Sequence, residues 1–229
     1  MLRDGTKAVL KIGMPHLEAE DEVAGLRLLD GDPTARLLEG DDAMNAMLLE
    51  HCDPGTPLRD LFQPDQDVVI AGLLKRFWRT PAEPHPFRDL SVMIRHWIAE
   101  TRAAESDWHD VHLVNEGIAV FENLCSTSIS STLIATDLHA GNVLRAEREP
   151  WLVIDPKPFI GDRAYDATQH LMNCRDRMRF DARNTMRRMA DLLEVDYDRV
   201  RLWMFARLAA EPRYDWDDES SEIARSIPR

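Results

Sequence analysis

Three oxygen-bearing side chains follow short apolar runs in the stretch 134–156: Asp137 ends the first run, Asn142 opens the second, and Asp155 ends the third. Apolar runs of this length predict buried strands, which would hold the three polar side chains at one edge. Carboxylate and amide oxygens suit a Mg²⁺ ion that binds phosphate groups, and a carboxylate can accept the proton of a hydroxyl nucleophile. The pattern therefore predicts phosphoryl transfer to a hydroxyl group, with Asp137 as the base and Asn142 and Asp155 as metal ligands.

These positions also carry a family resemblance. The spacing from Asp137 to Asn142 resembles the catalytic loop of kinases, and Asp155 matches the metal-binding Asp of the kinase Asp-Phe-Gly motif, here replaced by Ile-Asp-Pro as in small-molecule kinases. Residues 137–142 and 153–174 more narrowly resemble the aminoglycoside/hydroxyurea antibiotic resistance kinases, the group that contains the streptomycin 6-phosphotransferases. The alternative is that these Asp and Asn residues only cap turns between strands.

The chain departs from that family just before the catalytic loop. Where the family usually has His-Gly-Asp, this sequence has Ala135, Thr136 and Asp137. In kinases the missing His supports the backbone geometry and does no chemistry. We therefore expect the substitution to affect the rate more than the class of reaction.

The resemblance implies an α+β, protein-kinase-like two-lobe fold. It predicts a truncated, β-rich N-terminal lobe at residues 1–50, a hinge at 51–56, and a mainly helical C-terminal lobe at 57–229 that holds the catalytic loop 134–156. The sequence begins where the turn into kinase strand three is expected, so the two strands that carry a Gly-rich loop are expected to be missing. ATP and Mg²⁺ are the implied cofactors.

The elements of the N-terminal lobe are expected to position the phosphates. Residues 7–13 predict a strand, in which Lys11 faces opposite to its apolar neighbours, and 15–30 predict a helix that ends at Gly31. By resemblance, Lys11 contacts the α- and β-phosphates and pairs with Glu22, with Glu18 as the second choice. The alternatives are a solvent-exposed lysine on an edge strand and a solvent-facing glutamate.

A second pair of strands is predicted to lead into the hinge. Residues 35–39 and 43–50 read as strands around a turn at 40–42, and Pro54-Gly55 supplies a bend after them. By resemblance, the backbone groups of Glu50 and Cys52 bind adenine. An ordinary connection between a strand and a helix is the alternative.

The remaining segments predict mostly helices. Residues 68–77, 88–104 and 108–124 show helical spacing of apolar residues, with Trp97, Ile98, Leu113 and Phe121 as expected core. Further helices are expected after 162, at 179–193 and at 198–210, followed by an acidic tail, 211–229, in which Trp216 is a candidate for docking.

For the polar residues near these helices the sequence allows more than one role. Asp162 is expected to cap the helix that follows it. Asp166 on that helix would, by resemblance, contact a cationic substrate, although a structural role is as well supported. Lys157 is suited to meet either a phosphate group or a nearby acid, and the sequence does not decide between them.

Composition narrows the class of protein. A net charge of −13 disfavours nucleic acid as a partner and is compatible with a cationic substrate or simply with solubility. The three cysteines are odd in number and widely spaced, which favours a reducing cytoplasm. No apolar run approaches the length of a membrane span, and the sequence gives no indication of an oligomeric state.

The sequence thus predicts transfer of the γ-phosphoryl group of ATP to a hydroxyl of a small cationic antibiotic such as streptomycin. A kinase of hydroxyurea or of another hydroxylated metabolite is one alternative, because the catalytic loop would be the same. The other is a nucleotide-binding pseudokinase that acts through protein contacts, which the expected loss of the Gly-rich loop favours. The presence of Lys11, Asp137, Asn142 and Asp155 opposes it.

Overall fold

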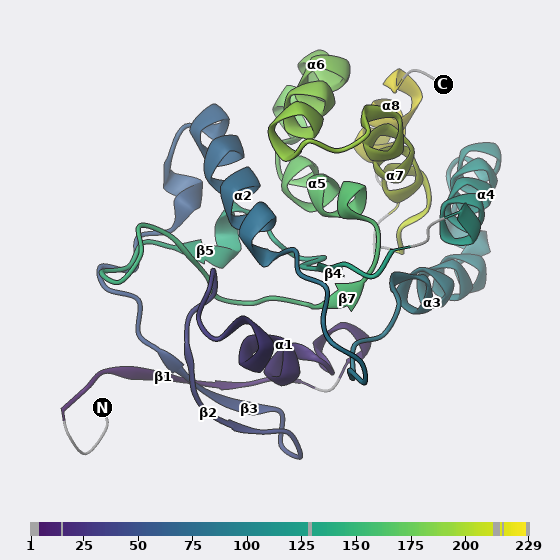
Figure 1. Ribbon diagram of the computed structural model, residues 1–229. Helices are drawn as coiled ribbons and strands as arrows, with labels where there is room; N and C mark the ends of the chain where they lie inside the picture. The colour runs from purple at the N-terminus through teal and green to yellow at the C-terminus, as the bar shows by residue number, and fades with distance from the viewer. Residues whose placement is uncertain (1–4, 15, 128–129, 213–215, 217, 228–229) are drawn as a thin grey trace. The chain divides into compact units, whose positions relative to one another are not determined.

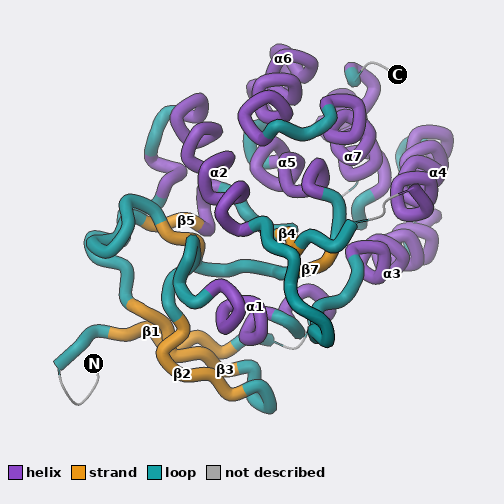
Figure 2. The backbone as a smooth tube through the Cα atoms, viewed as in Figure 1, coloured by secondary structure: helices purple, strands orange, loops and turns teal. Residues whose placement is uncertain are grey.

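A computed structural model describes residues 5–14, 16–127, 130–212, 216 and 218–227. The chain divides into two compact units, one made of residues 1–88 and 131–160 and the other of 89–130 and 161–229. Within the described residues, the first unit holds all the β-strands together with helices α1 and α2, and the second unit is helical (Figures 1 and 2). The lobe boundaries expected at residues 50 and 57 stay a prediction.

The N-terminal sheet of the first unit has three antiparallel strands. They are β1 (Ala8–Ile12), β2 (Leu37–Asp41) and β3 (Ala46–Glu50), in the order β1-β3-β2. Helix α1 (Glu22–Leu29) lies beside this sheet in Figure 1, and its Val23 and Leu26 pack with Met47 and Leu49 of β3. This packing fixes α1 against the sheet that carries Lys11.

Two sequence predictions in this region need correction. The helix expected over 15–30 begins at Glu22, after a separate 3₁₀ turn η1 (Leu17–Ala19), and Pro15 lies outside the described residues. The turn expected at 40–42 begins later, because β2 continues to Asp41. The Asp41 carboxylate accepts hydrogen bonds from the amides of the next turn, and Asn45 takes a left-handed conformation with φ of 46°. Side-chain bonding to a turn is what moves this boundary.

The predicted strands of the catalytic region are present but very short. They are β4 (Leu133–Ile134), β5 (Val143–Leu144), β6 (Leu152–Val153) and β7 (Phe159–Ile160), paired as β4-β7 and β5-β6. All four belong to the first unit, together with η2 (Leu58–Asp60), η4 (Ala140–Asn142) and α2 (Gln63–Phe77). The amide of Ala35 donates to Val153 O at 2.8 Å, which joins the approach to β2 to β6.

The second unit is built from six α-helices and one 3₁₀ turn among its described residues. They are α3 (Leu90–Ala103), η3 (Glu105–Asp107), α4 (Val111–Thr127), α5 (Arg163–Met172), α6 (Arg175–Leu193), α7 (Tyr197–Ala210) and α8 (Asp218–Ser226). Their core contains an aromatic cluster of Trp97, Phe121, Tyr165 and Trp203, with ring centroids 5.3 to 6.5 Å apart. The predicted burial of Trp97, Ile98, Leu113 and Phe121 is confirmed.

The C-terminal boundaries differ from those expected. Helix α6 begins at Arg175 instead of Arg179 and contains a kink at Asp181, whose φ of −156° is not helical. Helix α8 was not predicted, because its segment is acidic and carries few apolar residues. Trp216, just before it, is buried and lies 6.2 Å from the ring of Trp108, which agrees with the expected docking of the tail.

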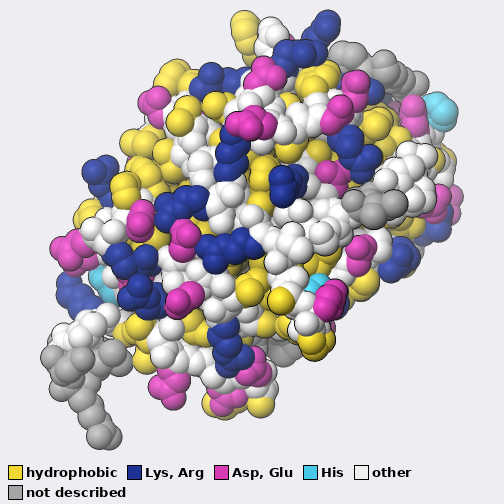
Figure 3. All heavy atoms as spheres, viewed as in Figure 1, with side chains coloured by type: hydrophobic (Ala, Val, Ile, Leu, Met, Phe, Trp, Pro, Cys, Tyr) yellow, Lys and Arg dark blue, Asp and Glu magenta, His cyan; other side chains and the backbone are white. Residues whose placement is uncertain are grey.

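Two further features of the molecule are the hydrophobicity of its helices and the distribution of charge on its surface. No helix among the described residues is both long and apolar enough to cross a lipid bilayer. Positive and negative side chains are interspersed over the face drawn in Figure 3, so the acidic excess does not gather into one patch on that face.

Candidate active site

Four charged side chains meet inside the first unit. Lys11 Nζ from β1 contacts Glu22 Oε1 at the start of α1 and Asp155 Oδ1 after β6. Lys157 Nζ contacts the same Asp155 oxygen and lies 3.1 Å from Glu22 Oε2. Two lysines and two carboxylates, drawn from three separate segments, thus form one charge-balanced cluster. The structure pairs Lys11 with Glu22, as the sequence predicted, and adds a contact between Lys11 and Asp155 that the sequence did not predict.

Glu22 and Lys157 are buried in this cluster, whereas Lys11 and Asp155 stay partly accessible to water. Glu22 is 0% exposed and Lys157 is 7% exposed, whereas a quarter of the Lys11 side chain remains accessible. Burial by itself would raise the pKa of Asp155, but the hydrogen bonds from Lys11 and Lys157 outweigh it and lower that pKa. Burial would likewise lower the pKa of Lys157, but Glu22 and Asp155 raise it. Each charge is therefore stabilised by its neighbours, as buried ion pairs require.

The alternation of β1 explains why Lys11 points inward. Residues in a strand face alternate sides, so Lys11 lies opposite to Leu10 and Ile12, as expected from the sequence. Leu10 is 66% exposed and Ile12 is 70% exposed. The strand thus presents its charged residue to the site and its large apolar residues to solvent, the reverse of the usual pattern.

Asp137 and Asn142 contact each other across the short loop between β4 and β5. Asn142 Nδ2 donates to Asp137 O at 3.1 Å and lies 3.3 Å from Asp137 Oδ2. His139 Nδ1 accepts a hydrogen bond from the Gly141 amide, which leaves the ring proton on Nε2, 3.9 Å from Asp137 Oδ1. The Asp137 carboxylate is therefore oriented by the Asn142 amide and faces a donor on His139.

Pairing of β5 with β6 places Asn142 and Asp155 on neighbouring segments. Asn142 O accepts a hydrogen bond from Ile154 N at 3.0 Å, and Asp155 is the next residue. The two side chains supply an amide oxygen and a carboxylate whose lowered pKa keeps it ionised, and both are ligand types that Mg²⁺ prefers. This donor set fits a magnesium site.

Ala135 and Thr136, which stand where the family has His-Gly, are hydrogen-bonded to Lys157 in the segment after β6. Lys157 N donates to Ala135 O at 3.1 Å, and the Thr136 hydroxyl donates to Lys157 O at 2.6 Å. Thr136 has a φ of 48°, a left-handed conformation that glycine adopts more easily. The side-chain hydrogen bond offsets part of that cost, so Thr136 can occupy the glycine position of the family motif.

The residues predicted to bind adenine lie at the end of β3. The Glu50 amide donates to Arg36 O at 2.9 Å, so the adenine prediction rests on the Glu50 carbonyl and the Cys52 backbone. The Glu50 carboxylate accepts from Arg148 Nε at 3.0 Å and Nη2 at 2.8 Å, and Cys52 packs in a small core with Leu152. Although burial opposes it, the hydrogen bond from Arg148 lowers the pKa of Glu50.

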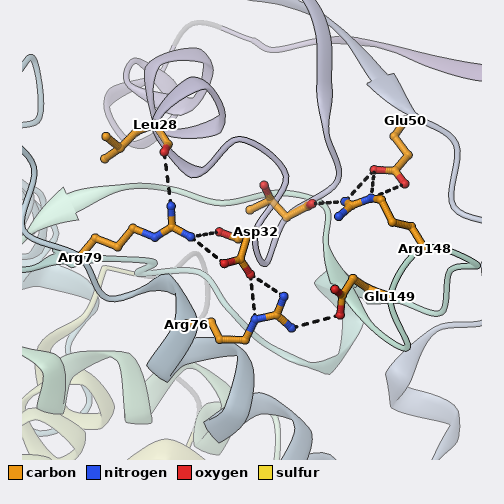
Figure 4. A network of polar contacts seen from close by, with 8 residues as sticks. Leu28, Asp32, Glu50, Arg76, Arg79, Arg148 and Glu149 are labelled. Atoms are coloured by element: carbon orange, nitrogen blue, oxygen red, sulfur yellow. Dashed lines mark hydrogen bonds and ion pairs between the residues drawn. The ribbon is translucent and has the colours of Figure 1, made fainter.

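The contact between Glu50 and Arg148 is part of a larger polar network (Figure 4). Arg148 also donates to Thr34 O at 3.0 Å, and Asp32 lies between the guanidinium groups of Arg76 and Arg79. These contacts join the chain after α1, the C-terminal half of α2 and the loop between β5 and β6. The network thus links three segments of the first unit that lie far apart in the sequence.

Two predicted acids belong to the second unit. Asp162 accepts from the Ala164 amide at 3.0 Å and caps α5, as predicted, and its other carboxylate oxygen accepts from Arg199 Nε and Trp203 Nε1. Asp166 lies in α5 and is buried. Its contact with a cationic substrate stays a prediction.

The sequence left the partner of Lys157 open between a phosphate group and an acid, and it did not indicate the contacts of Thr136 and His139. One signal was available for Lys157: in an extended segment, residues two apart face the same side, so Lys157 points the same way as Asp155. The Thr136 hydroxyl bonds to the distant Lys157 carbonyl and the His139 ring bonds to the nearby Gly141 amide, and no spacing rule indicates either hydrogen bond.

Comparison with known proteins gives consistent matches. The family described as "Aminoglycoside/hydroxyurea antibiotic resistance kinase" matches residues 1–215. The "Streptomycin 6-kinase" of Streptomyces griseus is 36% identical over 234 residues, which cover 97% of this chain and 75% of the relative. The "Hydroxyurea phosphotransferase" of Kitasatospora aureofaciens is 32% identical over 230 residues, 96% of this chain and 65% of the relative.

Solved structures support the same fold. The choline kinase LicA from Streptococcus pneumoniae aligns with a TM-score of 0.65 at 12% identity, over 97% of this chain and 79% of that one. At this identity the likeness establishes the fold and nothing finer. The predicted α+β, protein-kinase-like fold is confirmed.

Proposed function

The chain belongs to the aminoglycoside/hydroxyurea antibiotic resistance kinase family, and from that membership we propose that it transfers the γ-phosphoryl group of ATP to a hydroxyl of a small cationic antibiotic. The observation that carries the proposal is the assembly, within one unit, of the Lys11-Glu22-Asp155 cluster and the Asp137-Asn142 contact. A lysine for phosphates, two oxygen ligands for a metal and a carboxylate base are the parts that phosphoryl transfer needs.

In the proposed reaction, Asp137 orients the acceptor hydroxyl and accepts its proton as the hydroxyl oxygen bonds to the γ-phosphorus. The bond from that phosphorus to the bridging oxygen of ADP breaks, and the products are the phosphorylated acceptor, ADP and a proton. Asn142 keeps the Asp137 carboxylate in place by its contacts to Asp137 O and Oδ2. Positioning and charge neutralisation supply the rate, without a covalent enzyme intermediate.

The nucleotide would be held from several sides. Lys11, steadied by Glu22, would bind the α- and β-phosphates, and the Glu50 carbonyl and Cys52 backbone would bind adenine. Asn142 and Asp155 would hold Mg²⁺, which when bound neutralises charge on the phosphate oxygens. The accessible part of Lys11 supports this assignment, because a phosphate contact requires an approachable ammonium group.

Streptomycin is the first candidate acceptor, because the Streptomyces griseus relative is named for it and shares 36% of its residues with this chain. The net charge of −13 favours a cationic substrate over an anionic one. Hydroxyurea is the second candidate, through the Kitasatospora relative. The cytoplasm stays the proposed compartment, which is in keeping with Cys52, Cys125 and Cys174 being free thiols.

The proposal is tested by measuring ADP release in the presence of ATP and Mg²⁺, with streptomycin, hydroxyurea and choline as separate acceptors. We expect release to require one acceptor, with streptomycin the most active, and mass spectrometry should find that acceptor phosphorylated. Activity with hydroxyurea alone would move the assignment to the second candidate. ADP release that no acceptor stimulates would contradict a small-molecule kinase for this panel.

A further inference from the structure

Lys157 duplicates the contacts of Lys11. Both ammonium groups reach Asp155 Oδ1, and each takes one oxygen of the Glu22 carboxylate, Lys11 at Oε1 and Lys157 at Oε2. A kinase-type site needs one lysine for the phosphates, so the second lysine calls for a separate explanation. Its burial supplies one, because the Lys157 side chain is 8% exposed against 25% for Lys11. Lys157 is therefore the less suited of the two to meet a phosphate group.

We propose that Lys157 is a positioning residue that keeps Glu22 neutralised while Lys11 binds the nucleotide phosphates. The inference rests on the proposed nucleotide-binding function, and it assigns to Lys157 a task that the sequence left undecided. Lys157 would act on the nucleotide only through Glu22 and Lys11.

The argument begins with Glu22, which is fully buried. A buried carboxylate that loses its partner is strongly destabilised. If Lys11 were its only partner, every movement of Lys11 toward a phosphate would leave Glu22 uncompensated. With Lys157 Nζ 3.1 Å from Glu22 Oε2, a positive charge remains beside the carboxylate throughout.

The same logic applies at Asp155. Coordination of a divalent cation by this carboxylate requires that positively charged neighbours move away from it, because like charges repel. Glu22 is then the remaining carboxylate partner of both lysines, and each lysine already contacts a different one of its two oxygens. Lys11 is the more exposed and is free to turn to the phosphates, whereas Lys157 stays with Glu22.

The backbone of Lys157 is fixed well enough for this task. Its amide donates to Ala135 O, and its carbonyl accepts from the Thr136 hydroxyl at 2.6 Å. In addition, Pro158 lies against Gly25 of α1, where a Cβ atom would come within 2.7 Å of its ring. The Lys157 segment is thus held both by the start of the catalytic loop and by the helix that carries Glu22.

The test measures the dissociation constant of MgADP by calorimetry for wild type, Lys157→Met, Lys11→Met and the double variant, with the exposed Lys7→Met as the matched control. We expect Lys157→Met to weaken binding about tenfold, the scale of one lost charge-assisted hydrogen bond, because Lys11 must then stay with Glu22. In the Lys11→Met background the same change should alter binding less than about twofold, since the residue through which it acts is gone. An equal loss in both backgrounds, or no loss in the wild-type background, would overturn the proposal.

A second comparison guards against misfolding of Lys157→Met. In the Glu22→Gln background residue 22 carries no charge for Lys157 to neutralise, so adding Lys157→Met should leave MgADP affinity within about twofold of Glu22→Gln alone. A further tenfold loss there would show that Lys157 acts on the nucleotide by another route and would also overturn the proposal. Because MgADP binding needs no acceptor, a wrong assignment of streptomycin would leave these results unchanged, and the two failures are distinguishable.

Discussion

The Thr136 hydroxyl donates a hydrogen bond to the backbone carbonyl of Lys157 at 2.6 Å, and this bond joins the residue before Asp137 to the segment that follows Asp155. Thr136 is buried and adopts a left-handed conformation with φ of 48°. The position that is a glycine in the family motif is therefore occupied by a residue with an unfavourable backbone conformation and a compensating side-chain bond.

Two substitutions at this position separate these effects. Thr136→Ala keeps the left-handed strain and loses the buried hydrogen bond, so it should lower the free energy of unfolding by about 1–3 kcal/mol. Thr136→Gly loses the same bond but relieves the strain, and it should be clearly less destabilising. Urea denaturation of the three proteins measures the difference. Equal stability of the Ala and Gly variants would show that the backbone conformation carries no cost here.

The close packing of α4 on α7 predicts opposite effects for two glycine substitutions. A Cβ atom at Gly117 would lie 2.7 Å from the Cβ of Ala209, whereas one at Gly72 in α2 would meet no atom within 4 Å. Gly117→Ala should therefore destabilise the protein by about 1–3 kcal/mol through overpacking. Gly72→Ala should stabilise it by up to about 1 kcal/mol through helix propensity. Thermal unfolding of both variants measures this, and a stabilising Gly117→Ala would contradict the packing.

The bond between Arg148 and Glu50 predicts a pH-dependent contribution to stability. The pKa of Glu50 is lowered in the folded chain, so its ionised form stabilises the fold above the unfolded pKa of about 4.3, and this contribution disappears as the pH falls through the folded pKa. Arg148→Met should cost about 1 kcal/mol at pH 7, since the pair is partly exposed.

Urea denaturation of wild type and Arg148→Met at pH values from about 2.5 to about 8 would check this contribution of Glu50. That range extends to both sides of the unfolded glutamate pKa of about 4.3. The gap in stability between the two proteins should narrow toward the acid end. A gap that stays constant over the whole range would mean that Arg148 acts through packing and not through the Glu50 charge.

Cys125 should be an unreactive thiol in the native protein. Burial, followed by the nearby Asp89 charge, raises its pKa to about 11, so the reactive thiolate is scarce at neutral pH. Its alkylation by iodoacetamide should be slow at pH 7.5 and should accelerate steadily up to pH ~10, as measured by mass spectrometry of the Cys125 peptide. Rapid modification at pH 7.5 in the folded state would contradict the raised pKa.

Sequence reasoning reached the parts of the site that depend on short-range patterns. The contact of Lys11 with Glu22 followed from the strand and helix patterns together with the family resemblance, and Asp155 followed from an apolar run that ends in an acid. For Lys157 the sequence indicates only that it faces the same side as Asp155, because its contact with Glu22 depends on how α1 and the loop after β6 meet in three dimensions.

Boundaries were the weaker part of the fold prediction, for local reasons. Asp41 bonds to the amides of the following turn and so extends β2 past Gly40, which by itself reads as the turn residue. Helix α1 starts at Glu22 because the preceding residues form the separate turn η1. Periodicity describes the apolar face of an element, whereas its ends are set by such individual hydrogen bonds.

The most direct test of the central claim compares wild type with Asp137→Asn in Mg²⁺-dependent phosphorylation of streptomycin, with the exposed Asp60→Asn as control. The account predicts that Asp137→Asn lowers kcat by at least about 10²-fold, because the proton acceptor for the hydroxyl is lost, while MgADP affinity remains and Asp60→Asn is fully active. An Asp137→Asn enzyme that phosphorylates streptomycin at the wild-type rate would contradict the assignment of Asp137 as the base.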